Sequence, residues 1–309
     1  MVCSKKPARA EARLLKPAVA LRPVPWRIEE HARNVHRLCF DGIRSGWEQF
    51  ALLQSDEHWD NPHCNRALYL RHLQLAQERR APVIKYGDLF CAMQGKWDKR
   101  SSKNDLRPEH QQGDYLDALV RTAADYHAPY ADILAIAGPG NHETGILKHH
   151  ETHLTERWVE AMRTLAPRTP LRCTGFSGWV IFQFSTPGGH KQSYTLWYHH
   201  GYGGGGPVTK GVIQTNRRAV YVTDADIVAT GHTHDQWIVP IPKLKLSREL
   251  RPRKANQVHV CSPGYKDDYG DGHGGWEVER GGPPKPQGAI WLHFTYVNDE
   301  IHLEARLAD

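Results

Sequence analysis

The strongest constraint in this sequence is a short apolar run that ends in two glycines and a group of polar side chains. Residues 132–137 (DILAIA) have the length and the Gly/Pro boundary of a buried parallel strand, and GPGNHE follows at 138–143. In open α/β sheets, binding crevices form at the carboxyl ends of the strands. We therefore expect Asn141 and His142 at such an edge, where they could bind a metal ion or a phosphate. Taken alone, the segment is equally consistent with a tight turn.

Four further apolar segments, at residues 47–55, 82–86, 191–198 and 226–230, predict strands that also run into polar side chains. The residues that follow them, in chain order, are Asp56 and His58, Asp88, His199 and His200, and His232 and His234. Residues two apart on an extended segment point to the same side, so the D-x-H and H-x-H pairs each form half of a metal site. Any one of these groups could be a polar turn, but all five in this order are hard to explain as turns.

Helices are predicted between these strands. Apolar residues at helical spacing indicate helices at 65–80, 113–126 and 152–165, and residues 208–221 favour another. Alternation near the end of the chain predicts a hairpin at 288–307 with Asn298 and Asp299 in the turn. The order of helices and strands indicates the α/β class. We expect residues 1–46 to form a basic, partly flexible extension and residues 47–309 to form a single domain.

Composition narrows the class of protein. An apolar content of 39% and a charged content of 24% are ordinary for a globular protein, and no window of about 18 apolar residues could span a membrane. The net charge of +6 permits attraction to polyanions but is mild for a dedicated nucleic-acid binder. The 6 cysteines include no C-x-x-C pair, which argues against a disulfide framework or a thiolate zinc site and favours a reducing compartment.

Two segments could contact a substrate. The polar loop after Asp88 contains Lys96 and Arg100; such a run is usually a solvated loop, but it could form a basic wall that meets phosphate oxygens. Tyr202 precedes a run of glycines at 203–206 and could stack on a base or an aryl leaving group, although packing is the commoner role of such a side chain.

The motifs D-x-H, G-D, G-N-H-E, H and G-H-x-H, in this order between residues 50 and 237, resemble the signature of the calcineurin-like metallophosphoesterase superfamily. The segments SDEHWDNPHC, GDLFCAMQGKWD and HHGYGGGG are similar to its bacteriophage and prophage branch. The resemblance implies an αββα fold, a two-sheet β-sandwich flanked by helices with the active site at the carboxyl ends of the strands. For a chain derived from a phage, it also implies the cytoplasm of a bacterial host.

The resemblance further implies a centre of two divalent ions, which could be Mn, Fe, Zn, Ni or Co. The first ion would be held by Asp56, His58 and His234. The second would be held by Asn141, His232 and one histidine of the pair His199 and His200, and Asp88 would bridge the two ions. Neighbours on a strand point in opposite directions, so we expect only one of the pair to bind. We prefer His199, because the ligand in superfamily members often lies two residues before the glycine.

Two divalent ions can clamp a phosphate and supply a hydroxide for in-line attack on phosphorus. His142 is then the candidate catalytic group, either as proton donor to the leaving oxygen or as a stabiliser of phosphoryl charge. Many phosphatases of the superfamily read GDxxDRG, in which the second aspartate supports this histidine, but Cys91 occupies that position here. Support for His142 would then come from elsewhere, such as Glu143 or a backbone carbonyl, or His142 would act mainly through its charge.

Three functions remain open. The basic surface, the Lys/Arg loop and the absence of GDxxDRG favour a phosphodiesterase acting on a nucleotide or a nucleic acid. The alternative is a phosphomonoesterase for a small molecule or a phosphoprotein. The third is a catalytically silent relative that binds metal or nucleic acid, which the complete set of expected ligands argues against.

Overall fold

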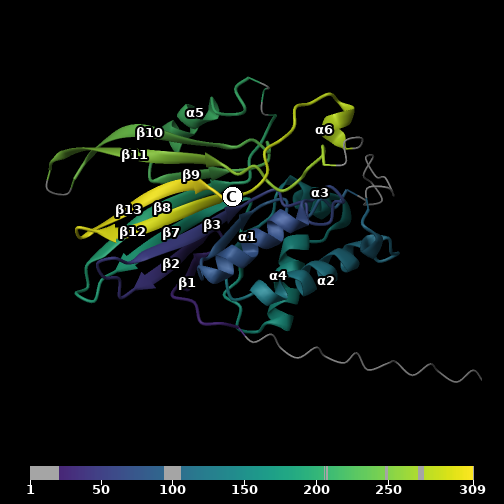
Figure 1. Cartoon of the computed structure of the whole chain (residues 1–309), viewed down its shortest axis with the longest axis horizontal. Coiled ribbons are helices and arrows are strands. Elements are labelled where there is room, and N and C mark those ends of the chain that lie inside the picture. The colour runs from purple at the N-terminus through teal and green to yellow at the C-terminus, as the bar shows by residue number, and fades with distance from the viewer. Residues whose placement is uncertain are drawn as a thin grey trace, which may run out of the picture.

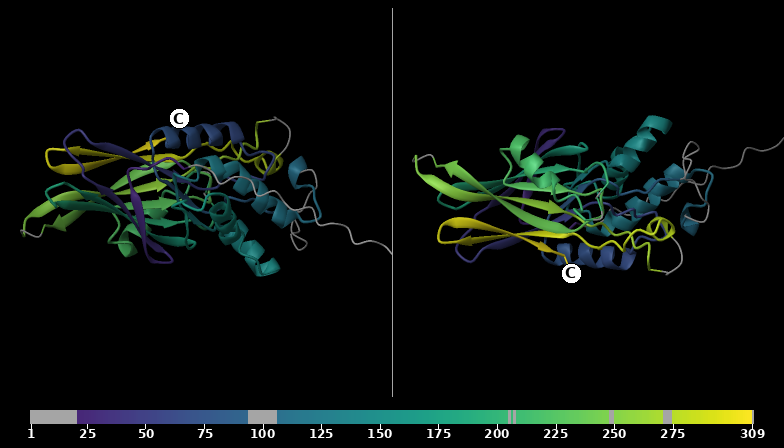
Figure 2. Two further views of the ribbon diagram at one scale, coloured as in Figure 1. Left: turned by 90° about the horizontal axis from the view of Figure 1, so that it is seen from below. Right: turned by 90° about the horizontal axis from the view of Figure 1, so that it is seen from above.

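The computed structural model describes residues 21–93, 106–204, 206, 208–247, 250–270 and 275–308. Its framework is two mixed β-sheets packed as two layers, with helices on the outer sides (Figures 1 and 2). This arrangement confirms the expected α/β sandwich. Within the described parts of the chain, no helix has the length and apolar character needed to cross a lipid bilayer.

The six-stranded sheet carries the first three of the expected strand ends. Its order is β13 (Glu300–Leu307), β12 (Ile290–Val297), β3 (Glu48–Gln54), β4 (Val83–Tyr86), β5 (Leu134–Gly138) and β6 (Arg172–Cys173). Neighbouring strands from β3 to β6 are parallel, while β12 pairs antiparallel with both β3 and β13. The carboxyl ends of β3, β4 and β5 therefore meet at one edge of the sheet.

The seven-stranded sheet carries the other two of the expected strand ends, those of β8 (Lys191–His199) and β9 (Ile227–Thr230). Its order is β1 (Arg27–Ala32), β2 (Val35–Asp41), β7 (Ser177–Ser185), β8, β9, β11 (Pro252–Cys261) and β10 (Trp237–Leu246). Strands β8 and β9 are parallel, with His199 opposite Thr230 at their carboxyl ends. The segments after these two strands thus leave the sheet side by side.

The helices cover the outer faces of the sandwich (Figures 1 and 2). On the six-stranded sheet these are α1 (Arg66–Glu78), α2 (Tyr115–His127) and α4 (Leu154–Leu165), and α5 (Gln214–Tyr221) lies on the other sheet beside β10. Helix α1 begins where the sequence predicts, because the Asn65 side chain accepts a hydrogen bond from the backbone of Leu68 at 3.1 Å. The remaining helical segments are η2 (Pro108–His110), η3 (Ala128–Tyr130), α3 (Asn141–His150) and α6 (Trp276–Glu279).

Alternation along the strands builds two apolar cores. Leu53 and Ile84 point between the sheets, where they join a cluster that includes Phe182 and Phe294, whose ring centroids lie 4.9 Å apart. Leu52, the neighbour of Leu53, points the other way into a second cluster beneath α1, α2 and α4. Strands buried on both faces read as continuous apolar runs, which is why these strands could be recognised in the sequence.

Several elements differ from the sequence-based expectations. Strands β1 and β2 lie within residues 27–41, so the seven-stranded sheet includes part of the segment expected as an extension. The hairpin of β10 and β11 was not expected, because Pro240 and Pro242 interrupt its first strand; β10 is an edge strand, where proline is tolerated. The helix expected from residue 208 begins only at Gln214. GPGNHE is not a simple loop, because its last residues begin α3.

Candidate metal centre

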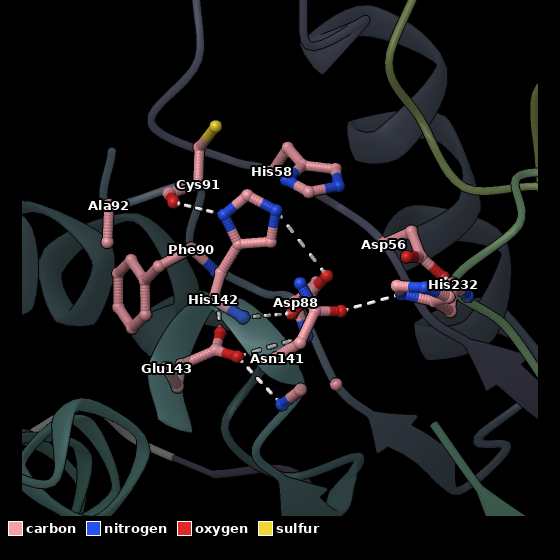
Figure 3. Close-up of polar contacts among 12 residues, drawn as sticks. Asp56, His58, Asp88, Phe90, Cys91, Ala92, Asn141, His142, Glu143 and His232 are labelled. Carbon is pink, nitrogen blue, oxygen red and sulfur yellow. Dashed lines mark hydrogen bonds and ion pairs between the residues drawn. The ribbon is translucent and has the colours of Figure 1, made fainter. Parts of the chain in front are cut away.

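The loops that follow strands of both sheets meet, and Figure 3 shows Asp56, Asp88, Asn141 and His232 from four of them close together. Backbone hydrogen bonds join them: Asp56 N–H donates to Gly87 O at 2.9 Å, and His58 N–H donates to Asp88 O at 3.0 Å. On the other sheet, Gly231 N–H donates to His200 O at 2.8 Å. The polar side chains at the strand ends are therefore held in place by their own main chain.

The first group of potential ligands consists of Asp56, His58 and His234, each of which offers an atom within 4.8 Å of the others. The Nε2 atoms of His58 and His234 lie 3.2 Å apart, and Asp56 Oδ1 lies 3.5 Å from His234 Nε2. This is the same trio that the resemblance implies for one ion.

The second group consists of Asp88, His200 and His232, again with ligand atoms within 4.8 Å of one another. His200 Nε2 lies 3.1 Å from Asp88 Oδ2 and 3.0 Å from Asn141 Oδ1. His232 Nδ1 lies 2.6 Å from the same Asn141 oxygen. The structure thus brings Asn141, Asp88 and His232 together as expected, with His200 as the member of the histidine pair.

His199, which the sequence analysis preferred, lies outside the group. Its Nδ1 accepts a hydrogen bond from Gly201 N–H at 2.9 Å, and its ring packs edge-on against Phe176 at 5.2 Å between centroids. His200 is fully buried and faces Asp88. Both rings pack against Phe176, but only the His200 ring reaches Asp88 and Asn141.

The backbone at these positions is strained. Asp56, His58, Asp88, His232 and His234 all have positive φ, from 44° to 70°. Such a conformation costs a non-glycine residue on the order of 1–3 kcal/mol and is concentrated at functional sites, where surrounding structure enforces it. Its recurrence at five members of the two groups indicates that the fold is built to present them.

Two glycines let the backbone pass close to the potential ligands Asp88 and Asp56. A Cβ atom at Gly140 would lie 2.1 Å from Asp88 Oδ1, and one at Gly231 would lie 2.4 Å from Asp56 Oδ2. No other residue fits at either position without moving a potential ligand. Gly140 and Gly231 are therefore part of the site.

The residues present fit a bound cation. Within the described residues, the buried atom Asp56 Oδ1 has no hydrogen-bond partner. An unsatisfied buried carboxylate oxygen is costly, and a cation between Asp56, His58 and His234 would satisfy it. Carboxylate, amide and imidazole ligands together suit first-row divalent ions.

Burial keeps the two histidines of the first group in the neutral form that can bind a metal ion. Burial lowers the pKa of His58 well below its ordinary value and lowers the pKa of His234 to about 3, so both imidazoles are neutral at pH 7. Burial also raises the pKa of Asp56, to about 7. Burial alone would likewise raise the pKa of Asp88, but the adjacent His200 and His142 hold it well below the ordinary value. Asp88 is therefore an anion at the centre of the site.

His142 lies beside Asp88 and belongs to neither of these two groups, although its ring, His58 and Cys91 form a third set with potential ligand atoms within 4.8 Å of one another (Figure 3). Its Nδ1 is 2.5 Å from the carbonyl oxygen of Cys91, and its Nε2 is 3.8 Å from Asp88 Oδ2. A carbonyl can only accept a hydrogen bond, so Nδ1 donates and Nε2 is left facing the centre. The support for this ring is therefore a backbone carbonyl.

Glu143, the other residue expected as support, has a different role. Its buried carboxylate accepts hydrogen bonds from the backbone N–H groups of Gly140, Phe90 and Asp88, at 2.7, 2.9 and 3.2 Å (Figure 3). It ties the start of α3 to the loop after β4. Because α3 begins at Asn141, the N–H of His142 at its first turn also donates to Asp88 Oδ1, at 3.0 Å.

The expected substrate contacts are less complete. Tyr202 is 55% exposed; its ring centroid lies 5.9 Å from that of His199, and the Arg218 guanidinium lies 5.7 Å above it. Lys96 and Arg100 fall outside the described residues.

The sequence analysis did not identify one residue near the site. Asp60 is buried and accepts hydrogen bonds from the backbone N–H groups of Cys91 and Ala92. Nothing in the local sequence indicates it, because its partners lie 31 and 32 positions later.

Comparison with solved structures finds neighbours of low similarity to this chain. No family model and no curated protein sequence matches it. Vacuolar protein sorting 29 of Cryptosporidium parvum aligns over 85% of this chain and 98% of its own, with 10% identity and a TM-score of 0.34. The calcineurin-like phosphoesterase YfkN of Bacillus subtilis aligns over 85% and 90%, with 13% identity and a TM-score of 0.32. Such weak similarity does not assign the chain to a family.

Proposed function

We propose that this protein is a metal-dependent phosphoester hydrolase, and more specifically a phosphodiesterase that uses two divalent ions. The observation that carries the proposal is the pair of adjacent three-residue groups at the strand ends, with a buried anionic aspartate at the second. Asp56, His58 and His234 would hold one ion. Asn141, His200 and His232 would hold the other, with Asp88 between them.

When bound, such ions would polarise a phosphoryl oxygen and lower the pKa of a bound water, the chemistry that two-metal hydrolases use. The protein's own part is to place the reacting groups. The helix N-terminus at Asn141 directs the His142 N–H to Asp88, and the Cys91 carbonyl orients the His142 ring. His142 Nε2 then faces the centre, where it would hold the proton that passes to the leaving oxygen.

We favour a diester because the polyanions that a positively charged protein attracts, such as nucleic acids, are linked by phosphodiesters. The chain carries a net charge of +6, which attracts polyanions such as a nucleotide or a nucleic acid. Tyr202 is exposed beside His199 and would stack on a base or an aryl group. The alternative is a phosphomonoesterase, since the same pair of ions can serve either substrate.

The test is metal analysis of the purified protein together with rates on bis-(p-nitrophenyl) phosphate and p-nitrophenyl phosphate, with Mn²⁺, Zn²⁺, Fe²⁺, Ni²⁺ and Co²⁺ supplied in turn. We expect about two ions per chain and a higher kcat/KM for the diester. A higher value for the monoester would favour the phosphatase alternative. Metal binding without turnover of either substrate would instead indicate the silent relative.

A further inference from the structure

The peptide group between Cys91 and Ala92 is hydrogen-bonded at both ends to side chains. Its carbonyl oxygen, on Cys91, accepts from His142 Nδ1 at 2.5 Å (Figure 3). Its N–H, on Ala92, donates to Asp60 Oδ2 at 3.0 Å. One amide therefore connects a carboxylate to the imidazole that faces the candidate metal centre.

Asp60 is well placed to hold this amide. Asp60 is only 2% exposed. The second oxygen of its carboxylate, Oδ1, accepts a hydrogen bond from Cys91 N–H at 2.6 Å. Tyr115 Oη also donates to Oδ2, at 3.2 Å. Hydrogen bonds from N–H groups to an ionised carboxylate are shorter and stronger than those between neutral groups. Both oxygens of Asp60 are thus used to fix two consecutive N–H groups.

The segment needs such an anchor. Ala92 has a φ of 48°, a left-handed conformation that alanine adopts only when its surroundings enforce it. An amide whose N–H is bonded to an anion is also polarised, so its carbonyl becomes a better acceptor. Asp60 therefore both orients the Cys91 carbonyl and strengthens the hydrogen bond that His142 donates to it.

We propose that Asp60 is a positioning residue for the reaction: acting through the Cys91–Ala92 peptide, it fixes the His142 ring with Nδ1 protonated and Nε2 toward the leaving oxygen. In this way a carboxylate supports the histidine without touching it, although cysteine stands where many phosphatases have an aspartate. The inference rests on the proposed phosphoester hydrolase function.

Glu143 offers a matched control. It is equally buried at 2% exposure and accepts two N–H groups of the same loop, those of Asp88 and Phe90. It does not bind the amide that holds His142. Glu143→Gln would remove an oxygen that accepts these N–H groups and would disturb the loop in general, whereas Asp60→Asn would act on the His142 support.

The kinetic test compares Asp60→Asn, His142→Ala, the double variant and Glu143→Gln on two diesters, one with a p-nitrophenolate and one with an alkoxide leaving group. A poor leaving group needs a proton donor and a good one does not. We expect Asp60→Asn to lower kcat about 10- to 100-fold on the alkyl substrate and less than about threefold on the aryl substrate. Added to His142→Ala, it should cause no further loss on the alkyl substrate.

Two kinetic outcomes would overturn the inference. One is a loss of the same size on both substrates, as expected for Glu143→Gln, which would mark Asp60 as a structural residue of the loop. The other is a full additional loss in the double variant, because Asp60 would then act independently of His142.

A second readout does not depend on turnover. In protein with ¹⁵N-labelled histidine, recorded at a pH at which the His142 ring is neutral, the resonances assigned through His142→Ala should show a protonated Nδ1 and an unprotonated Nε2 in the wild type. Asp60→Asn should shift that pattern toward a mixture of tautomers, and Glu143→Gln should leave it unchanged. An unchanged pattern in Asp60→Asn would overturn the inference. If the wild type hydrolyses neither diester, the proposed function fails, and the spectra alone decide the role of Asp60.

Discussion

Replacement of Lys85 by methionine should destabilise this protein strongly, because Lys85 neutralises a buried carboxylate. Its Nζ lies 2.8 Å from Glu57 Oε1, and the two side chains are 1% and 0% exposed. The same ammonium donates to Gln54 Oε1 and to Tyr69 Oη, each at 2.7 Å. Glu57 stands between Asp56 and His58 in the chain, so the pair also anchors the segment that carries two candidate ligands.

The expected loss in the free energy of unfolding depends on the groups that remain after Lys85 is replaced. Methionine fills most of the volume of the lysine stem, so the cavity contribution is small. The carboxylate of Glu57, however, remains buried without a cation, and breaking a buried pair in this way typically costs about 3–5 kcal/mol. In the double variant Lys85→Met/Glu57→Gln no charge is stranded, so we expect it to recover about 1–3 kcal/mol of that loss.

Urea unfolding at pH 7 measures these differences. The control is Lys245→Met, which breaks the more exposed pair with Asp226, with 30% and 25% exposed side chains and a 3.0 Å separation. Because solvent screens such a pair, the control should lose less than about 1 kcal/mol. A loss as small as this in Lys85→Met would refute the argument, since it would mean that Glu57 is solvated or neutral in the folded protein.

The other predictions concern the site and the pH dependence of folding. His200→Ala should lower the bound metal measured by elemental analysis, while His199→Ala should retain it; the reverse result would restore His199 as the ligand. Asp88→Asn should abolish turnover and lower metal content, whereas His142→Ala should slow turnover by roughly 100-fold or more with metal retained. Full activity in either variant would refute its assigned role. Burial lowers the pKa of His259 from 6.5 to about 4. Between these two pH values the unfolded chain therefore binds a proton at His259 that the folded chain does not bind. The free energy of unfolding should therefore decrease from pH 6.5 to 4, and less steeply in His259→Gln; equal slopes would contradict the assignment.

Much of the fold could be read from local pattern. Continuous apolar runs such as residues 132–137 predict buried strands, and β5 lies there. The amphipathic segments at 65–80 and 152–165 contain α1 and α4. Where the apolar pattern was weaker, tertiary contacts determined the secondary structure. Strand β10 contains prolines, which are tolerated because β10 lies at the edge of its sheet.

The candidate site divides in the same way. The sequence by itself determined which residue types stand at the strand ends, because parallel strands bring their carboxyl ends to one edge. It left open which of His199 and His200 faces that edge, since both suit an extended segment and only the packing of β8 against β9 separates them. The support of His142 by the Cys91 carbonyl, and of that peptide by Asp60, was decided by tertiary structure alone. Hydrogen bonds between residues tens of positions apart depend on coordinates in space, which no local periodicity encodes.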